Sequence, residues 1–219
     1  MIPFRHKALW LSCLTALASM MLPGDARAQQ SDLETAVKAT YLYKLAPFVQ
    51  WPADTGADYA MTSDHGTTFN LCIAGRDPFG ALLDDAVRGL MITDRPVIVR
   101  RMGVVLDGAG CHVLYVSPDG RQPAEEIIER VHGKPILTVT DGSDRPAETG
   151  IIDFVEQDGN IRFRIDLAKA EAGNLAISSK LLSLAVSVVE APSDVEPAPA
   201  QTSPPEPSPV EPAAGGPQE

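Results

Sequence analysis

Beyond its N-terminal region, the chain opens with a helical stripe of apolar residues. They are Leu33, Val37, Tyr41 and Leu45 at every fourth position, with Leu42 beside them. This period predicts an amphipathic helix over residues 33–45 with one buried face. Asp32 can cap its first turn, and Pro47 should kink or end it, because proline has no amide hydrogen to donate to the preceding turn.

Short apolar runs then alternate with helical patterns. The runs have the length and apolar density of buried strands and lie at residues 69–74, 96–101, 112–116 and 136–140. The helical patterns lie at residues 79–87 and 125–131. This alternation indicates βα units and a mostly parallel sheet that is covered by helices on both faces.

The end of the domain departs from that order. Runs at residues 151–156 and 161–166 flank Asp158-Gly159, which is a strong hairpin signal because both residues tolerate left-handed backbone. An antiparallel pair should therefore close the sheet. Leucines in residues 178–189 predict a final helix with a broad apolar face. The expected fold class is a single three-layer α/β/α domain, with a mostly parallel sheet and a C-terminal antiparallel hairpin.

Residues 1–28 have the pattern of a secretory signal peptide. Arg5 and Lys7 make a basic start, an apolar run follows over residues 8–22, and Ala-Arg-Ala at residues 26–28 has the form of a cleavage site. The apolar run is shorter than the ~20 residues that span a bilayer. We therefore expect cleavage before Gln29 and no membrane insertion of the mature chain.

Residues 192–219 have a different composition. Nine of them are proline, five are acidic and none is basic, so they cannot build a core and should form a disordered, extended tail. The folded domain would then be residues 29–191, which suffices for one substantial core.

The charge balance narrows the class of partner. Signal cleavage would remove three of the 18 basic and one of the 29 acidic residues, which leaves 15 against 28 and a net charge near −13. Such an excess of negative charge disfavours nucleic acids and anionic lipid surfaces as general partners.

Cys72 and Cys111 are the cysteines that remain after cleavage. Each flanks a predicted strand, and a pair in an oxidising compartment predicts a disulfide. Two buried free thiols are the main alternative. A metal site would recruit His112, but the ligand spacings typical of zinc are absent, and no metal or other cofactor is expected. Three acidic residues in or near loops lack calcium-loop spacing, and most of them should simply be solvated: Asp141, Asp144 and Asp153.

The sequence contains no evident catalytic constellation. Ser178 and Ser179 precede Lys180, but they do not have the S-x-x-K spacing that would present both groups on one helical face. Serines that open a helix are more often caps. The G-x-S-x-G elbow that would place a triad serine is also absent. We therefore expect no enzymatic activity, and a secreted hydrolase is the weakest alternative.

Ordered motifs through the domain resemble those of the YfiR family of periplasmic proteins. They are Tyr41-Leu42-Tyr43-Lys44 with Phe48-Val49-Gln50-Trp51-Pro52, Cys72-Ile73-Ala74-Gly75-Arg76-Asp77-Pro78-Phe79-Gly80, Cys111-His112-Val113-Leu114-Tyr115-Val116, Gly133-Lys134-Pro135-Ile136-Leu137-Thr138-Val139, Gly150-Ile151-Ile152-Asp153-Phe154-Val155 and Ile177-Ser178-Ser179-Lys180-Leu181-Leu182. The resemblance covers about residues 34–189. It implies a periplasmic repressor whose partner is the sensor domain of an inner-membrane diguanylate cyclase. Repression would lower cyclic-di-GMP signalling and biofilm formation, and family members are often homodimers.

The chain departs from that family pattern in three places. Pro47 lies inside the first-helix motif. Some relatives carry a second cysteine pair around the segment that matches residues 145–153, and this chain has none there. The proline-rich tail lies beyond the family region. Redox switching that depends on the second pair is therefore not expected.

Tyr41, Phe48 and Trp51 are the candidates for partner binding. Aromatic residues at helical spacing are more often part of a core, but aromatic anchors also dominate interfaces, so both interpretations stay open. The alternative function is a periplasmic module that binds a small molecule in a crevice at the strand ends.

Overall fold

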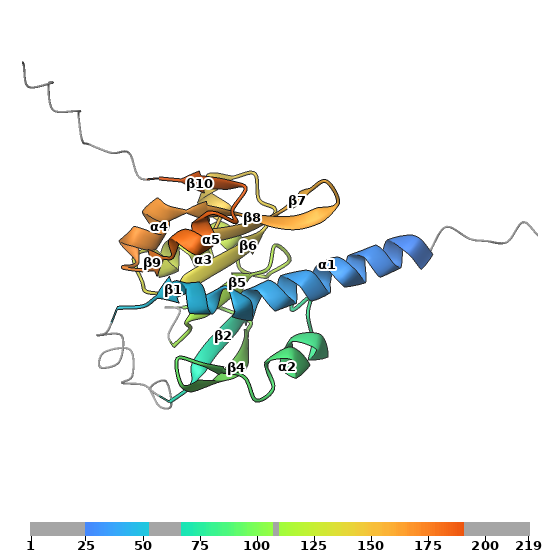
Figure 1. The fold of residues 1–219 in the computed structure, drawn as a ribbon, viewed down its shortest axis with the longest axis horizontal. Coiled ribbons are helices and arrows are strands. Elements are labelled where there is room, and N and C mark those ends of the chain that lie inside the picture. The colour runs from blue at the N-terminus through green and yellow to red at the C-terminus, as the bar shows by residue number, and fades with distance from the viewer. Residues whose placement is uncertain (1–24, 53–66, 107–109, 191–219) are drawn as a thin grey trace, which may run out of the picture.

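The computed structural model describes residues 25–52, 67–106 and 110–190, and side chains from residue 29 onward. The apolar run of the predicted signal peptide and the predicted tail lie outside the described residues. Within this part of the chain, one sheet has the strand order β10-β8-β7-β6-β5-β2-β4-β3 (Figure 1). Its strands are β2 (Phe69–Ala74), β3 (Met91–Ile92), β4 (Arg95–Met102), β5 (Val113–Val116), β6 (Leu137–Asp141), β7 (Ile152–Gln157), β8 (Asn160–Asp166) and β10 (Ser187–Val189).

Most neighbouring strands are parallel, as predicted. The parallel pairs are β2 with β4 and with β5, β5 with β6, β6 with β7, and β10 with β8. The pairs β3–β4 and β7–β8 are antiparallel. Every residue of β2 is buried, which agrees with its continuous apolar run and its place inside a sheet covered on both faces.

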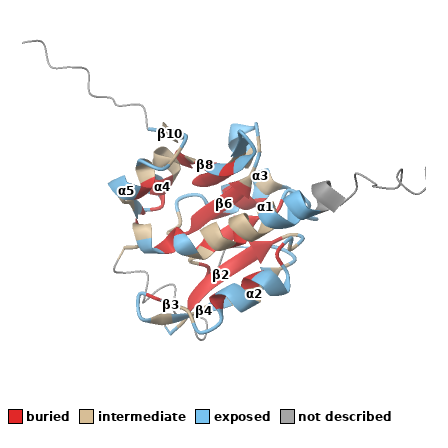
Figure 2. Ribbon diagram, turned by 45° about the vertical axis from the view of Figure 1, so that its right-hand side comes forward, coloured by how far each residue is buried: buried red, intermediate tan, exposed pale blue. Residues whose placement is uncertain are grey.

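Helices cover both faces of the sheet and give the expected three layers. The helical elements are α1 (Asp25–Lys44), η1 (Ala46–Phe48), α2 (Ala81–Val87), α3 (Ala124–Val131), η3 (Pro146–Glu148), α4 (Leu167–Ala172) and α5 (Ser179–Leu182). One apolar core joins α1 and α2 to the sheet through Leu42 and Leu83. A second core joins α3 to the opposite face through Ile127. Figure 2 shows the buried strands β2 and β6 beneath α1.

The first helix begins earlier than expected. It starts at Asp25, so Asp32 lies within the helix and is not its cap. It ends at Lys44, and Pro47 lies in the following 3-10 turn, in agreement with the helix-ending role expected of proline. The chain then forms β1 (Val49–Gln50), which pairs antiparallel with β9 (Ala176–Ile177).

The predicted final helix over residues 178–189 is wrong. Only α5 is helical there, and the chain continues as β10 along the outer edge of β8. Valines at 186, 188 and 189 favour extended backbone, and the free edge of β8 offers hydrogen-bond partners. The hairpin of β7 and β8 formed as predicted, but β10 closes this side of the sheet.

The expected disulfide is present between the two central strands. Cys72 in β2 is bonded to Cys111, which lies just before β5, and their Cα atoms are 5.8 Å apart. Both residues are buried in the core beneath α3. The bond therefore links neighbouring parallel strands whose connection runs through β4.

Candidate functional site

An apolar groove runs along α1, between this helix, β8 and α5; we call it the α1 groove. Its main section has a volume of about 400 Å³. The residues that carry the argument below come from α1, η1, β8, α5 and the turn that follows α5: Val37, Tyr41, Phe48, Phe163, Leu181 and Leu184. Two of the three sequence-predicted binding residues, Tyr41 and Phe48, therefore lie in one groove.

A second, more polar hollow of about 580 Å³ continues the groove toward the start of α1. It shares Val37 and Tyr41 with the main section and is also lined by Leu33, Glu34 and Arg162. Leu33, Val37 and Tyr41 are four residues apart on α1, so they form one stripe on the helix surface. Because Leu33 remains 65% exposed, the fold leaves the outer end of this stripe uncovered.

Tyr41 belongs both to the core and to the groove wall. Its ring lies 5.9 Å from the ring of Phe154 and 5.7 Å from that of Phe163, in the range of favourable aromatic pairs. These contacts hold the ring in place while one side lines the groove. Both interpretations of Tyr41 therefore apply: one side of its ring packs in the core, and the other side is available for binding in the groove.

The opposite end of the groove has cations on its rim. The Lys180 ammonium lies 5.6 Å from the centre of the Phe48 ring, within cation–π distance. Lys44 lines the same section, and both lysine side chains are exposed. An acidic chain therefore carries a small basic rim at an apolar groove.

Trp51 lies away from the α1 groove. Its ring packs edge-on against Phe69 at 5.5 Å and lies 6.4 Å from the His112 ring, and His112 itself stacks on Phe69 at 4.7 Å. The structure does not place Trp51 among the residues that line the groove with Tyr41 and Phe48.

Sequence reasoning missed the residues that complete the groove. Phe163 comes from β8, while Leu181 and Leu184 come from the segment expected to be one long helix. Their apolar character is evident from the sequence, but their position beside α1 depends on how the sheet and α5 pack. Leu184 follows α5 and is 57% exposed.

A polar contact fixes α1 on the carboxyl ends of the strands. The Lys38 ammonium on α1 donates to Asp141 Oδ2 at 2.8 Å, and the Tyr115 hydroxyl donates to the same oxygen at 3.3 Å. Burial raises the pKa of Tyr115 well above its ordinary value, and the Asp141 charge adds to the shift. The expectation that Asp141 is simply solvated is therefore wrong, because it joins α1 to β5 and β6.

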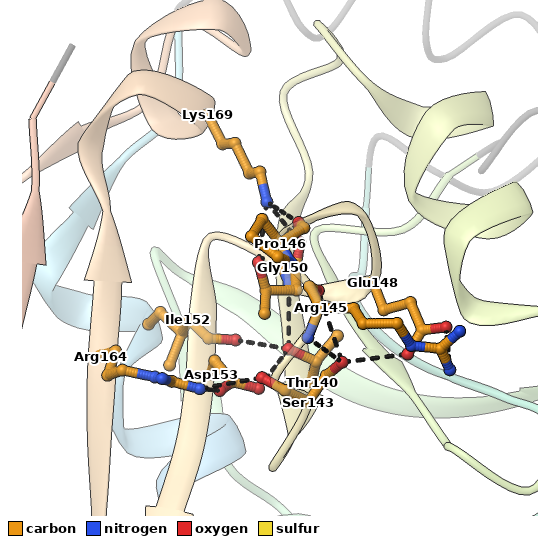
Figure 3. Close-up of polar contacts among 11 residues, drawn as sticks. Thr140, Ser143, Arg145, Pro146, Glu148, Gly150, Ile152, Asp153, Arg164 and Lys169 are labelled. Atoms are coloured by element: carbon orange, nitrogen blue, oxygen red, sulfur yellow. Dashed lines mark hydrogen bonds and ion pairs between the residues drawn. The ribbon is translucent and has the colours of Figure 1, made fainter. Parts of the chain in front are cut away.

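A second polar group supports β8 from behind; we call it the Asp153 cluster and define it as Thr140, Ser143, Asp153, Arg164 and Lys169 with the segment 145–150 (Figure 3). Asp153 is buried and accepts from Arg164 Nη2 at 2.6 Å and from the Thr140 hydroxyl at 2.7 Å. Its predicted solvation is therefore also wrong, whereas Asp144 is exposed as expected.

The rest of the cluster fastens the loop between β6 and β7. Arg164 donates to the Ser143 carbonyl at 2.9 Å, and Lys169 donates to the carbonyls of Pro146 at 2.9 Å and Thr149 at 2.7 Å. Arg164 neighbours Phe163 on β8, and successive residues of a strand point to opposite faces. The cluster therefore supports the strand whose other face contributes Phe163 to the groove.

The carboxyl ends of β2 and β5 are among the strand ends where the alternative function would place a crevice, and they are closely packed. A Cβ atom on Gly75 would lie 3.0 Å from the Gly120 Cα and 3.3 Å from the Ser117 Cβ. Gly75 also has φ of +88°, which favours glycine. The Phe79 ring packs on Tyr115 at 4.9 Å, and an Arg76–Asp119 ion pair closes the outer side. These contacts fill the space between the ends of these two strands.

Three further sequence predictions concern catalysis, metal binding and membrane insertion, and the described residues give observations on each. Ser178 caps α5, because its side chain accepts from the Leu181 amide, so the capping prediction is confirmed for Ser178, whereas Ser179 is the first residue of the helix. In this part of the chain, His, Cys, Asp and Glu side chains form no group of three or more that could hold a metal ion. None of the described helices has both the length and the apolar character to cross a bilayer.

Comparison with known proteins adds one match. A family model described as YfiR/HmsC-like matches residues 35–186, which is more than half of the chain. All residues that line the main section of the α1 groove fall within this range, and the proline-rich tail falls outside it. A search of curated proteins finds no match.

Proposed function

Because the chain belongs to the YfiR/HmsC-like family, we propose that it is a periplasmic regulatory protein that represses an inner-membrane diguanylate cyclase. The mature protein, beginning at Gln29, binds the periplasmic sensor region of the cyclase. This contact lowers cyclic-di-GMP signalling and biofilm formation. Family membership fits a regulatory protein better than a catalytic one.

The α1 groove carries the proposal. Its aromatic walls are fixed by core contacts, and Leu33 and Leu184 stay 65% and 57% exposed at its two ends. Apolar side chains gathered around a hollow mark interaction sites in soluble proteins. The groove suits an amphipathic segment of the sensor region, with apolar side chains against Tyr41 and Phe48.

Repression follows if the groove binds only one conformation of the sensor region. A ligand shifts a two-state equilibrium only through its difference in affinity for the two states. Moving the cyclase from mostly active to mostly inactive, 1:99 to 99:1, needs a preference of about 10⁴-fold. The regulator thus needs no reaction of its own.

Deletion of the gene tests the regulatory role. Cellular cyclic-di-GMP should rise, and the exported wild-type protein should lower it again. A version without residues 2–28 should fail, since it stays in the cytoplasm. If deletion leaves cyclic-di-GMP and surface attachment unchanged while the partner cyclase is expressed, the repressor proposal is wrong.

A matched pair of variants tests the groove. Leu184→Asp places a charge in the groove, whereas Val104→Asp changes a side chain that is equally exposed, at 57%, and does not line the groove. Leu184→Asp should fail to restore repression, and Val104→Asp should restore it. Equal repression by both variants would show that the interface lies elsewhere.

The α1 groove is also a candidate site for the alternative function, the binding of a small molecule. Its volume of about 400 Å³ lies in the range of ligand pockets, and its walls are mainly apolar. Native mass spectrometry of the protein purified from the periplasm distinguishes the two functions. A stoichiometric bound small molecule that Leu184→Asp abolishes would favour the binding module.

A further inference from the structure

We propose that the proline-rich tail of the chain, residues 192–219, binds in the α1 groove of the same molecule and competes there with any partner. This inference goes beyond the regulatory function and does not depend on the identity of the partner. It rests on the chemistry of the groove, the chemistry of the tail and the length of chain that joins them.

The groove has the features that bind polyproline II helices. Such helices lie in grooves with aromatic walls, where proline rings pack on flat side chains. Tyr41 and Phe48 supply these walls, and Leu184 supplies an exposed apolar edge. Tyr41 is held by Phe154 and Phe163, so little side-chain freedom is lost on binding.

The tail contains a segment with the complementary pattern. A polyproline II helix has three residues per turn, so Pro204, Pro207 and Val210 share one face. Glu206 and Glu211 lie on the other faces of the same segment. One apolar face can therefore enter the groove while the carboxylates remain in water. Binding in this extended form needs no folded structure in the tail.

Charge favours this surface over the rest of the domain. The tail carries five acidic residues and no basic residue, whereas residues 29–191 carry 15 basic and 23 acidic residues, a net charge of −8. The domain as a whole therefore repels the tail. Lys44 and Lys180 on the rim at Phe48, with Arg162 in the second hollow, supply three positive charges along the groove against the one carboxylate of Glu34. Carboxylates beside the apolar face can pair with them.

The connecting chain is long enough. The described chain ends at Glu190, just after β10, which pairs with β8 beside Phe163 of the groove. The residues from 190 to 204 reach about 40 Å in polyproline II form. This reach is similar to the diameter of a domain of this size, with a radius of gyration of about 15 Å. A tether of this kind gives effective concentrations in the millimolar range, so a weak contact suffices.

Nuclear magnetic resonance on the exported chain, residues 29–219, tests the proposal. The amides of Glu206, Ser208 and Val210 should show order parameters above about 0.6, and the Val210 methyl groups should show contacts to the Tyr41 and Phe48 rings. Both observations should be independent of protein concentration, as binding within one molecule requires. Concentration dependence would instead assign the contact to a second copy and overturn the proposal.

Two matched pairs of variants separate a specific contact from general ordering. Leu184→Asp and Val210→Asp should release the segment and lower the order parameters below about 0.6. Val104→Asp and Ala200→Asp add the same charge outside the two contacting surfaces and should leave the segment ordered. The tail variants cannot disturb the core, so they remain informative if a groove variant folds poorly. Equal, low order parameters in the wild type and all variants would overturn the proposal without bearing on repression of the cyclase.

Discussion

The two halves of the central sheet are held together by different chemistry. Between β2 and β5, a covalent bond joins Cys72 to Cys111 inside the apolar core beneath α3. Around β6, β7 and β8, the Asp153 cluster joins strands and loop through an ion pair and hydrogen bonds. The stability of the first half should therefore fall when a reductant breaks the disulfide. The stability of the second half should fall when a single charged group or hydrogen-bond donor is removed.

This difference matters for the α1 groove, because β8 contributes Phe163 to its wall. No cysteine occurs in residues 145–153 of this chain, so no second disulfide can fasten this segment. Lys169 and Arg164 fasten this segment instead, through the carbonyls of Pro146, Thr149 and Ser143. Support of the groove from behind is thus polar and does not depend on thiols.

Removal of the disulfide should have the largest effect on stability. The double variant Cys72→Ala with Cys111→Ala should lose about 4 kcal/mol in the free energy of unfolding, since the bond closes a loop of 39 residues in sequence separation. Urea denaturation measures this loss. Dithiothreitol should lower the stability of the wild type and leave that of the double variant unchanged. If dithiothreitol left the stability of the wild type unchanged, the disulfide would not be what stabilises this half of the sheet.

Asp153→Asn should have the next largest effect, about 2–3 kcal/mol. The amide keeps one acceptor where the carboxylate accepts from both Thr140 and Arg164, and this group is buried. Urea denaturation under oxidising conditions measures the loss. Arg145→Ala is the control, because its pair with Glu148 is exposed on the arginine side and should contribute less than 1 kcal/mol. Similar losses in both variants would show that burial of the pair is unimportant.

Tyr115 links the two halves, and its ionisation should weaken the fold at high pH. Its pKa is raised in the folded state, so the folded protein keeps the proton when the unfolded chain releases it above pH ~10. Stability is then present below the unfolded pKa and falls as pH rises. Tyr115→Phe should reduce this slope by about 1.4 kcal/mol per pH unit above pH 10. Equal slopes in urea titrations of the two proteins would show that Tyr115 ionises freely.

Lys169→Met should have the smallest effect, about 1 kcal/mol or slightly more. Methionine keeps much of the apolar stem but removes the donor to the Pro146 and Thr149 carbonyls. Amide hydrogen exchange should become faster locally, over residues 146–150, with little change in β2 and β5. Lys180→Met is the control, since Lys180 is exposed and lies outside the cluster. Uniformly faster exchange would show that the segment is not a separate unit.

Local signals in the sequence predicted much of the fold correctly. The continuous apolar run of β2, the Asp158-Gly159 turn and the serine cap of α5 were all assigned from residues close together in the chain. Asp166 caps α4, yet this short helix was overlooked, although an aspartate before an alanine-rich stretch is a readable start signal.

The sequence by itself predicted the strands β2, β4, β5, β6, β7 and β8, the hairpin and the disulfide as the favoured state of the two cysteines. These predictions rest on the hydrophobic period, on turn residues and on the even number of cysteines, which can all be read from the sequence without knowing how distant elements pack. Only the tertiary structure decided that the valines after α5 form β10, since this required the free edge of β8. It also decided that Asp153 meets Arg164 and that the α1 groove exists. These features form where side chains from elements distant in the sequence come into contact. Whether such side chains are buried or exposed depends on how the elements pack, which the local sequence does not specify.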